Sequence, residues 1–225
     1  MNRMDCAILA GGDFGEAEAA LFRSFSEGSY LIAADRGLES ALRYGLRPDV
    51  VIGDFDSISP GVLDGFEGRL IRLNPVKDDT DTEAALHLAL EETEGRIFIW
   101  GGFGSRMDHV LANIHILRIA AHVGREAFLM NACNRIRILK GSLVLERAQQ
   151  FGRYVSFFPL TSVVEGLRLE GFAYPLANAS LAIGSSLGTS NELLEEQGRI
   201  SFAKGELVMI ESRDAAGGSA NRNTH

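Results

Sequence analysis

Cysteine is nearly absent from this chain, and the two that occur, Cys6 and Cys133, have neither Cys-x-x-Cys spacing nor a nearby histidine pair. This argues against a disulfide scaffold or a zinc site and predicts buried free thiols in a reducing cytosol. Long hydrophobic runs are missing as well. The apolar run at 7–10 is too short for a signal peptide or a membrane span. We therefore expect a cytoplasmic protein with no membrane partner.

An excess of positive charge is also lacking. The chain has 22 Lys and Arg residues against 30 Asp and Glu residues, which gives a formal net charge of −8. This balance argues against nucleic acid as a partner, because such proteins carry basic patches. It does not argue against a nucleotide, since a bound metal ion can reverse the local charge. With 225 residues, 46% of them hydrophobic, the chain can form one large domain or two small ones.

The first part of the chain alternates strand-like and helix-like segments. We predict strands at 7–10, 30–34, 50–53, 69–73, 96–100 and 126–130, and helices at 16–25, 38–44, 81–91 and 108–122. Such alternation is typical of a parallel sheet with helices on both faces, so residues 1–134 are predicted to form an α/β nucleotide-binding domain. Thr80 and Asp108 are expected to cap the last two helices. The buried face of the last helix is predicted to contain Leu111, Ile114 and Leu117.

The sequence pattern changes after about residue 134. Short strand-like runs separated by turn residues follow at 135–139, 142–147, 154–158, 162–169, 180–183, 200–203 and 206–211. This pattern predicts an all-β sandwich over residues 135–212. The small and polar residues 213–225 are interpreted as a disordered tail.

Carboxylates stand where three of the predicted strands end. They are Asp35, Asp54, Asp56, Asp78, Asp79 and Asp81. In a parallel sheet all six would gather at the edge where open α/β sheets bind ligands. Two unit charges about 4 Å apart repel by about 4 kcal/mol at an effective dielectric of ~20. A cation is therefore expected among them, and oxygen ligands favour Mg²⁺.

Asp54 and Asp56 form the sharpest pair, because residues two apart in an extended segment share a face and can reach one cation. Phe55 would then turn into the core. Aspartates in a polar turn are the alternative. Asp35 follows the second strand and can either cap the next helix or contact a metal or a ribose.

The segment Lys77-Asp78-Asp79-Thr80-Asp81 mixes a cation with acids at a helix N-terminus. Acids that complement the helix dipole explain Asp81 without a functional role. They do not explain Lys77, which suits a phosphate oxygen as a point charge. We assign Lys77, Asp78 and Asp81 to the site and interpret Asp79 as solvated.

A glycine-rich loop, residues 101–109, joins the fifth predicted strand to its helix. Glycines such as Gly102 let the backbone approach a ligand, and the helix N-terminus offers N–H groups to anions. Arg106 can bind phosphate with two hydrogen bonds, and Asp108 stands beside it. His109 is more readily explained by capping or packing than by catalysis. Taken alone, the sequence predicts a polar turn at Thr189-Ser190-Asn191-Glu192.

In this order these stretches resemble the thiamin pyrophosphokinase family, especially its bacterial members. The matching stretches are Ala34-Asp35-Arg36-Gly37, Gly45-Leu46-Arg47-Pro48-Asp49, Gly53-Asp54-Phe55-Asp56-Ser57-Ile58, Lys77-Asp78-Asp79-Thr80-Asp81, 101–109 with Asn113, and Ser190-Asn191-Glu192. They span about residues 7–212. The resemblance implies an α/β nucleotide-binding domain followed by a β-sandwich, and transfer of pyrophosphate from ATP to thiamin, which gives thiamin diphosphate and AMP.

The resemblance also implies roles by position. The acids that match the Mg²⁺ and ATP positions are Asp54, Asp56, Asp78 and Asp81, with Asp35 as a further active-site acid. Lys77 and Arg106 match the phosphate-binding positions, and Gly102 and Asp108 of the matching loop are expected to bind the nucleotide. On the thiamin side, Ser190 and Asn191 match a motif, and Tyr174 matches an aromatic position that could stack on a thiamin ring. Some members have tryptophan there, and some have Gly-Gly where this chain has Arg36-Gly37.

The resemblance further implies a homodimer whose thiamin pocket borrows Tyr174 and Ser190 from the partner chain. One alternative is a pyrophosphokinase of the same fold that acts on another hydroxymethyl heterocycle, such as a pterin. Another is a nucleotide-sensing module without turnover.

Overall fold

The computed structural model describes residues 4–56, 58–59, 61–64, 66–74 and 79–215. The chain divides into two compact units, Met1–Asn131 and Ala132–His225. No helix within the described ranges is long and apolar enough to cross a lipid bilayer. Residues 216–225 of the predicted tail lie outside these ranges.

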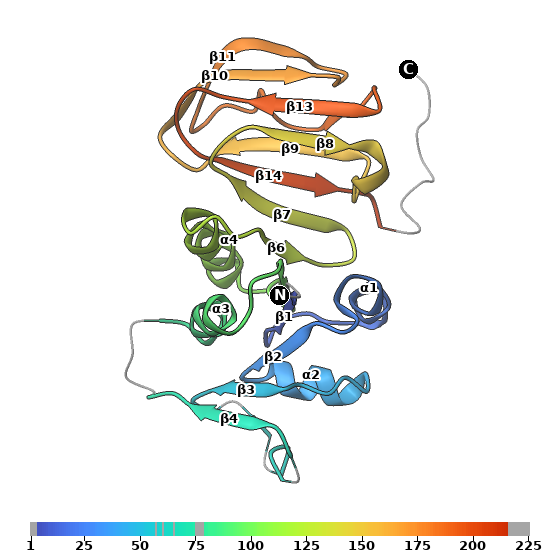
Figure 1. Ribbon diagram of the computed structural model, residues 1–225, viewed down its shortest axis with the longest axis vertical. Helices are drawn as coiled ribbons and strands as arrows, with labels where there is room; N and C mark the ends of the chain where they lie inside the picture. The colour runs from blue at the N-terminus through green and yellow to red at the C-terminus, as the bar shows by residue number, and fades with distance from the viewer. Residues whose placement is uncertain (1–3, 57, 60, 65, 75–78, 216–225) are drawn as a thin grey trace. The chain divides into compact units, whose positions relative to one another are not determined.

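The first unit is built on a parallel sheet (Figure 1). Its strands are β1 (Cys6–Leu9), β2 (Tyr30–Ala34), β3 (Val50–Gly53), β4 (Arg69–Arg72), β5 (Ile97–Trp100) and β6 (Ala127–Met130). They lie in the order β6-β5-β1-β2-β3-β4, and each pair is parallel. The strands β1, β3, β5 and β6 are buried at every position, which explains their unbroken apolar sequences. The predicted parallel sheet is confirmed.

Helices cover both faces of this sheet. They are α1 (Glu16–Ser26), α2 (Gly37–Arg43), α3 (Asp81–Glu92) and α4 (Met107–His122). Helices α1 and α2 lie on one face, and α3 and α4 on the other (Figure 1). From β1 the chain proceeds to β2 and β3 on one side, and it later returns to β5 on the other side of β1. Because parallel crossovers are right-handed, this reversal moves the helices to the opposite face and opens a crevice beyond the ends of β1 and β5.

The helix ends were predicted with mixed success. Thr80 is the N-cap of α3, as expected, and its hydroxyl accepts a hydrogen bond from the Glu83 N–H at 3.2 Å. The prediction that Asp108 caps α4 is wrong. Arg106 occupies the N-cap in an extended conformation, and Asp108 already lies in the first helical turn. The Arg106 side chain makes no cap hydrogen bond and instead pairs with that aspartate.

The buried face of α4 is also displaced from the prediction. Leu111 is 54% exposed, whereas Leu117 is buried. The buried residues of the helix are Val110, Asn113, Ile116, Leu117 and Ala120. Since the sequence of this helix is apolar around much of its circumference, its periodicity did not select one face.

The second unit is an antiparallel β-sandwich, as predicted. Its strands are β7 (Asn134–Leu139), β8 (Leu143–Glu146), β9 (Tyr154–Pro159), β10 (Val163–Glu170), β11 (Leu176–Ala182), β12 (Asn191–Glu192), β13 (Gln197–Ser201) and β14 (Leu207–Ser212), with a 3₁₀ turn at Arg147–Gln149. One layer has the order β12-β9-β14-β7 and the other β11-β10-β13-β8 (Figure 1). Apolar side chains from both layers form one core, which includes Phe157, Leu167, Phe172 and Met209.

Three strands of this unit differ from the prediction, and one of them, β13, begins at Gln197 rather than at residue 200. The strand β11 begins at Leu176 rather than at residue 180, and its sequence LANASLA is poor in the β-branched and aromatic residues that mark strands. The short β12 falls in the stretch interpreted as a polar turn, where Asn191 pairs with Val155 and Glu192 with Tyr154. Pairing with a neighbour distant in sequence, rather than local propensity, makes this segment extended.

The two thiols differ in burial. Cys6 is fully buried in β1, and burial raises the pKa of its thiol to about 12. Cys133 is only partly buried, so the expectation that both thiols are buried is wrong for this residue. Neither cysteine forms a disulfide within the described residues.

A buried ion pair holds the end of β14. The Glu211 side chain is 1% exposed and accepts hydrogen bonds from the Arg135 guanidinium, two of them at 2.8 Å. The Phe151 N–H donates to the same carboxylate at 2.9 Å. The charge of Glu211 is therefore compensated on several sides.

Candidate active site

A cleft of ≈ 710 Å³ opens beyond the carboxyl ends of β1, β2, β3 and β5 in the first unit. Among the residues that line it are Gly12, Asp35, Arg36, Asp54, Asp79, Thr80, Asp81, Gly102, Arg106, His109 and Asn113. This is the sheet edge at which the reversal of strand order predicts a ligand site. Five aspartates line the cleft against two arginines, so the described part of its wall is acidic.

Two glycines let the loops after β1 and β5 lie against each other. The Gly12 N–H donates to the Gly101 oxygen at 2.7 Å, and the Asp13 N–H donates to the Phe103 oxygen at the same distance. A Cβ atom on Gly12 would stand 2.1 Å from the Phe103 oxygen, and Gly101 has φ +66°. Larger residues at either position would force the loops apart.

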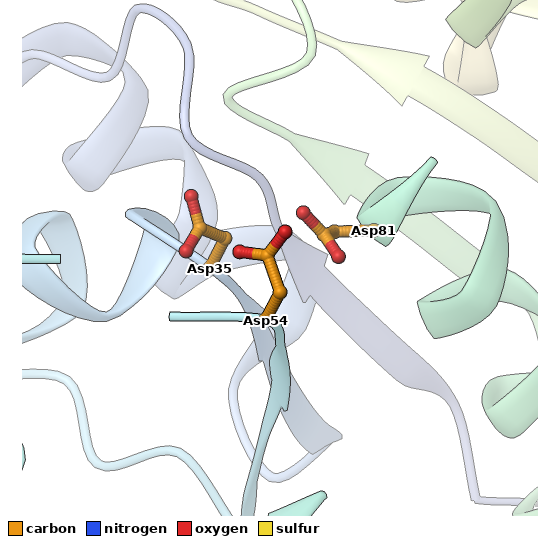
Figure 2. A group of neighbouring side chains, drawn as sticks. All are labelled: Asp35, Asp54 and Asp81. Atoms are coloured by element: carbon orange, nitrogen blue, oxygen red, sulfur yellow. The ribbon is translucent and has the colours of Figure 1, made fainter. Parts of the chain in front are cut away.

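Three carboxylates from different elements converge in this cleft. Asp35 follows β2, Asp54 follows β3, and Asp81 begins α3; Figure 2 shows these three side chains close together. One oxygen from each lies within 4.8 Å of the others. Hard oxygen donors at this spacing suit Mg²⁺ or Ca²⁺ rather than zinc.

Asp35 is the most constrained of the three. Its φ of 47° places it in the left-handed region, where a residue other than glycine costs about 1–3 kcal/mol. A Cβ atom on Gly53 would lie 3.2 Å from the Asp35 Cα, so only glycine passes beside it easily. Its Oδ1 atom is buried and has no hydrogen-bond partner among the described residues. Burial, together with the neighbouring carboxylates, raises the pKa of Asp35.

The turn after β3 does not have the expected extended form. Phe55 adopts φ 66°, and the Asp54 carboxylate accepts a hydrogen bond from the Asp56 N–H at 3.1 Å. Asp54 and Asp56 therefore do not share one face of a strand. Asp56 is exposed and lies outside the group of three carboxylates. Phe55 packs against the core, as predicted.

Arg72 holds this turn and was not recognised from the sequence. Its guanidinium lies 4.9 Å from the centre of the Phe55 ring and donates to the backbone carbonyl oxygen of Asp54 at 3.3 Å. The contact arises because β4 pairs with β3 in a register that sets Arg72 opposite Gly53. Register between strands far apart in sequence has no local signal, which explains the omission.

The glycine-rich loop ends in an exposed ion pair. The Arg106 guanidinium donates to Asp108 at 3.2 and 2.5 Å, and this lowers the pKa of the aspartate to about 2. Deeper in the loop, the buried Asn113 amide donates to the Gly102 oxygen at 2.8 Å. Asn113 thus fixes the loop from α4. A buried amide on an otherwise apolar helix face is the signal that could have suggested this role.

The remaining predicted residues fall into two groups. Lys77 and Asp78 lie outside the described residues, and the neighbouring Asp79 is exposed at the cleft. Tyr174, Ser190 and Asn191 belong to the second unit. The Tyr174 side chain is 66% exposed, Ser190 is exposed with φ 55°, and Asn191 is only 3% exposed.

The three converging carboxylates fit a divalent cation. The buried Oδ1 of Asp35 has no protein donor in the described ranges, and a cation would satisfy it. It would also offset the repulsion that raises the pKa of Asp35. Asp54 and Asp81 supply further oxygens from two other directions. The donor set therefore suits the Mg²⁺ expected from the sequence.

Comparison with known proteins adds to this geometry. The family model described as "Thiamin pyrophosphokinase, catalytic domain" matches residues 22–129, and the one described as "Thiamin pyrophosphokinase, vitamin B1 binding domain" matches residues 142–207. A thiamine pyrophosphokinase from Bacillus subtilis is 37% identical over 187 residues, which are 81% of this chain and 87% of that protein. The chain belongs to the thiamin pyrophosphokinase family.

Solved structures of the family agree with this assignment. The thiamine pyrophosphokinase of Bacillus subtilis superposes with a TM-score of 0.84 at 33% identity, covering 94% of this chain and 100% of that one. The yeast thiamin pyrophosphokinase has a TM-score of 0.78 at 13% identity, covering 93% and 86%, and supports the fold alone. Members of this family are ATP-dependent diphosphotransferases. The match of the vitamin B1 binding domain disfavours the alternative of a pterin substrate.

Proposed function

We propose that the acidic cleft binds ATP together with Mg²⁺ and transfers a pyrophosphoryl group to the hydroxyl of thiamin. The observation that supports this most is the convergence of Asp35, Asp54 and Asp81 at the carboxyl ends of parallel strands. Three carboxylates without a cation would repel one another at neutral pH, and a magnesium nucleotide relieves that repulsion.

Bound Mg²⁺ would neutralise charge on the phosphate oxygens. Arg106 supplies a planar guanidinium for two of these oxygens, after exchanging its exposed partner Asp108 for the nucleotide. Lys77 is proposed to add a point charge, and the N–H groups at the start of α4 are proposed to donate to the anion. The protein mainly orients the reactants and stabilises charge, as in other phosphoryl transfers.

The transfer itself is an in-line displacement. The thiamin oxygen forms a bond to the β-phosphorus of ATP, the bond between that phosphorus and the bridging oxygen of the α-phosphate breaks, and AMP leaves. A carboxylate of the cleft accepts the hydroxyl proton. Asp56 and Asp78 are proposed to complete the acid group once the nucleotide is bound.

Product analysis tests the reaction. The protein is incubated with ATP, MgCl₂ and thiamin, and the products are separated by chromatography. We expect AMP and thiamin diphosphate in equal amounts and no product when EDTA exceeds the metal. ADP with thiamin monophosphate would refute attack at the β-phosphorus. Nucleotide binding without any product would instead favour a nucleotide-sensing module.

The thiamin side is proposed to lie in the second unit. Tyr174 offers an exposed ring for stacking, and Ser190 offers an exposed hydroxyl. On the family resemblance we propose a cytoplasmic homodimer in which these residues complete the site of the partner chain.

Two inactive variants, Asp54→Ala and Ser190→Trp, would then complement each other, because a mixed dimer holds one intact site. Random mixing should restore about a quarter of normal activity. Mixed dimers without activity would reject the shared site.

A further inference from the structure

The side chain of Asn191 is occupied by backbone hydrogen bonds. Its Oδ1 accepts from the Tyr174 N–H at 2.9 Å, and its Nδ2 donates to the Tyr174 oxygen at 2.8 Å. The same Oδ1 accepts from the Glu192 N–H at 2.9 Å. With 3% of its surface exposed, Asn191 uses its amide to hold another residue's backbone.

This amide continues a short strand pairing. The segment 171–174 lies beside 191–194, where the Ala173 N–H donates to the Glu192 oxygen and the Leu194 N–H donates to the Gly171 oxygen, both at 2.8 Å. One step further along, the Asn191 amide replaces the backbone peptide as donor and acceptor toward Tyr174. A carboxamide has the same donor and acceptor geometry as a peptide group, so it can substitute for one.

Tyr174 is also fixed on both sides along the chain. Phe172, two residues earlier, is 4% exposed and packs edge-on against Phe157 in the sandwich core. Pro175 follows directly and restricts the backbone of Tyr174 to extended conformations. The backbone of Tyr174 is therefore held firmly while its ring is 66% exposed.

The neighbouring Ser190 is held in a similar way. The buried Ser156 hydroxyl accepts a hydrogen bond from the Ser190 N–H at 2.9 Å, which supports the left-handed φ of 55° at that residue. The buried members of this region thus bond to backbone, while the exposed Tyr174 and Ser190 are left to meet a ligand.

We infer that Asn191 is a positioning residue for thiamin binding, which acts by holding Tyr174 and does not itself contact thiamin. The inference rests on the proposed role of Tyr174 and replaces the direct contact that the sequence motif suggested for Asn191. Holding the backbone of Tyr174 in place lowers the entropic cost of stacking. Substitution of Asn191 should therefore weaken thiamin binding rather than slow the chemical step.

Asn191→Asp is the sharpest substitution. The carboxylate has the same shape and still accepts from two N–H groups, but it cannot donate to the Tyr174 oxygen and repels it. We expect the KM for thiamin to rise about tenfold, the worth of one stacked and ordered aromatic ring. The kcat and the KM for ATP should change by less than about twofold. Asn178→Asp is the control, because it makes the same change at an exposed asparagine, on β11 of the same unit.

A double-mutant cycle with Tyr174→Ala separates the two possible roles. If Asn191 acts through Tyr174, then Asn191→Asp should add less than about twofold to the thiamin KM of the Tyr174→Ala variant. If the two effects multiply, or if either single variant leaves the KM unchanged, the inference is wrong. Should Asn191→Asp fail to fold, Pro175→Ala loosens Tyr174 from the other side and should raise the thiamin KM by about threefold.

Calorimetric titration of thiamin distinguishes this inference from the proposed reaction. The same cycle can be measured as dissociation constants in the presence of a non-hydrolysable ATP analogue, without any turnover. A wild-type protein that binds thiamin and forms no thiamin diphosphate would contradict the proposed function. The binding cycle would still confirm or overturn the role of Asn191.

Discussion

The two units differ in how their buried carboxylates are compensated. In the second unit, Glu211 is 1% exposed and is matched by the Arg135 guanidinium and a backbone N–H. In the first unit, Asp35, Asp54 and Asp81 are half-buried, lie within 4.8 Å of one another, and include a buried oxygen with no partner among the described residues. The first arrangement is complete by itself, whereas the second suits an added cation.

The contrast separates stability from function. A compensated carboxylate adds order to a fold, whereas a group of like charges in a strained turn weakens it. Such a group persists when ligand binding offsets its cost. Substitutions should therefore have opposite signs in the two units: removing Glu211 should destabilise the protein, and neutralising a cleft aspartate should not.

The largest effect is expected from Glu211→Ala. The Arg135 side chain is only 14% exposed, so the substitution leaves a buried guanidinium without its carboxylate. Unfolding free energy measured by urea titration should fall by about 3–5 kcal/mol. The control is Glu165→Ala, which breaks an exposed pair with Lys204 at 3.6 Å and should cost less than about 1 kcal/mol. Equal losses in the two variants would remove the contrast.

Asp54→Asn should have the next largest effect, on turnover. Loss of one charge that is proposed to hold the metal nucleotide should lower kcat by at least about a hundredfold, as removal of a transition-state electrostatic contact does. The melting temperature should stay constant or rise, because repulsion is relieved. Asp64→Asn, at an exposed position away from the cleft lining, is the control and should keep full activity. A well-folded Asp54→Asn protein with normal turnover would exclude this residue from the metal site.

The parallel sheet was predictable because each of its strands is marked by the residues of that strand and of the turns beside it. The strands at Tyr30–Ala34 and Val50–Gly53 are short apolar runs bounded by turn signals, and they lie where the sequence predicts them. The β12 strand was missed because Asn191 and Glu192 become extended only by pairing with Val155 and Tyr154. The buried face of α4 was misplaced by one residue, since apolar residues surround much of that helix.

The site was predictable as a set of acids but not in its geometry. Strand ends alone indicated that Asp35, Asp54 and Asp81 would meet. The left-handed Phe55 separates Asp56 from them, and no sequence pattern marks a positive φ at phenylalanine. The contact of Arg72 with this turn depends on strand register, which local sequence does not encode.

Asp35→Asn should change the free energy of unfolding by less than Glu211→Ala does, and in the opposite direction. Asparagine tolerates the left-handed backbone of this position and removes one of the three charges. In EDTA the variant should be more stable than the wild type by up to about 1 kcal/mol, the usual worth of partly exposed charges. With Mg²⁺ present the order should reverse, because only the wild type gains stability from the ion. A variant less stable than the wild type in EDTA would contradict a repulsive cluster.

The smallest expected effect is the pH dependence of the stability difference between Asp35→Asn and the wild type. Burial and neighbouring charges raise the pKa of Asp35 in the folded state above its value in the unfolded chain. The folded protein then binds more protons than the unfolded chain over that interval, so stability falls as the pH rises through it. In EDTA, the advantage of Asp35→Asn should therefore be absent below about pH 4 and should grow as the pH rises through the raised pKa. Glu211→Gln should show no such gain in stability toward neutral pH, because its carboxylate is already paired with Arg135. An advantage of Asp35→Asn that stays constant from pH 4 to 7 would mean that backbone strain, rather than charge, separates the two units.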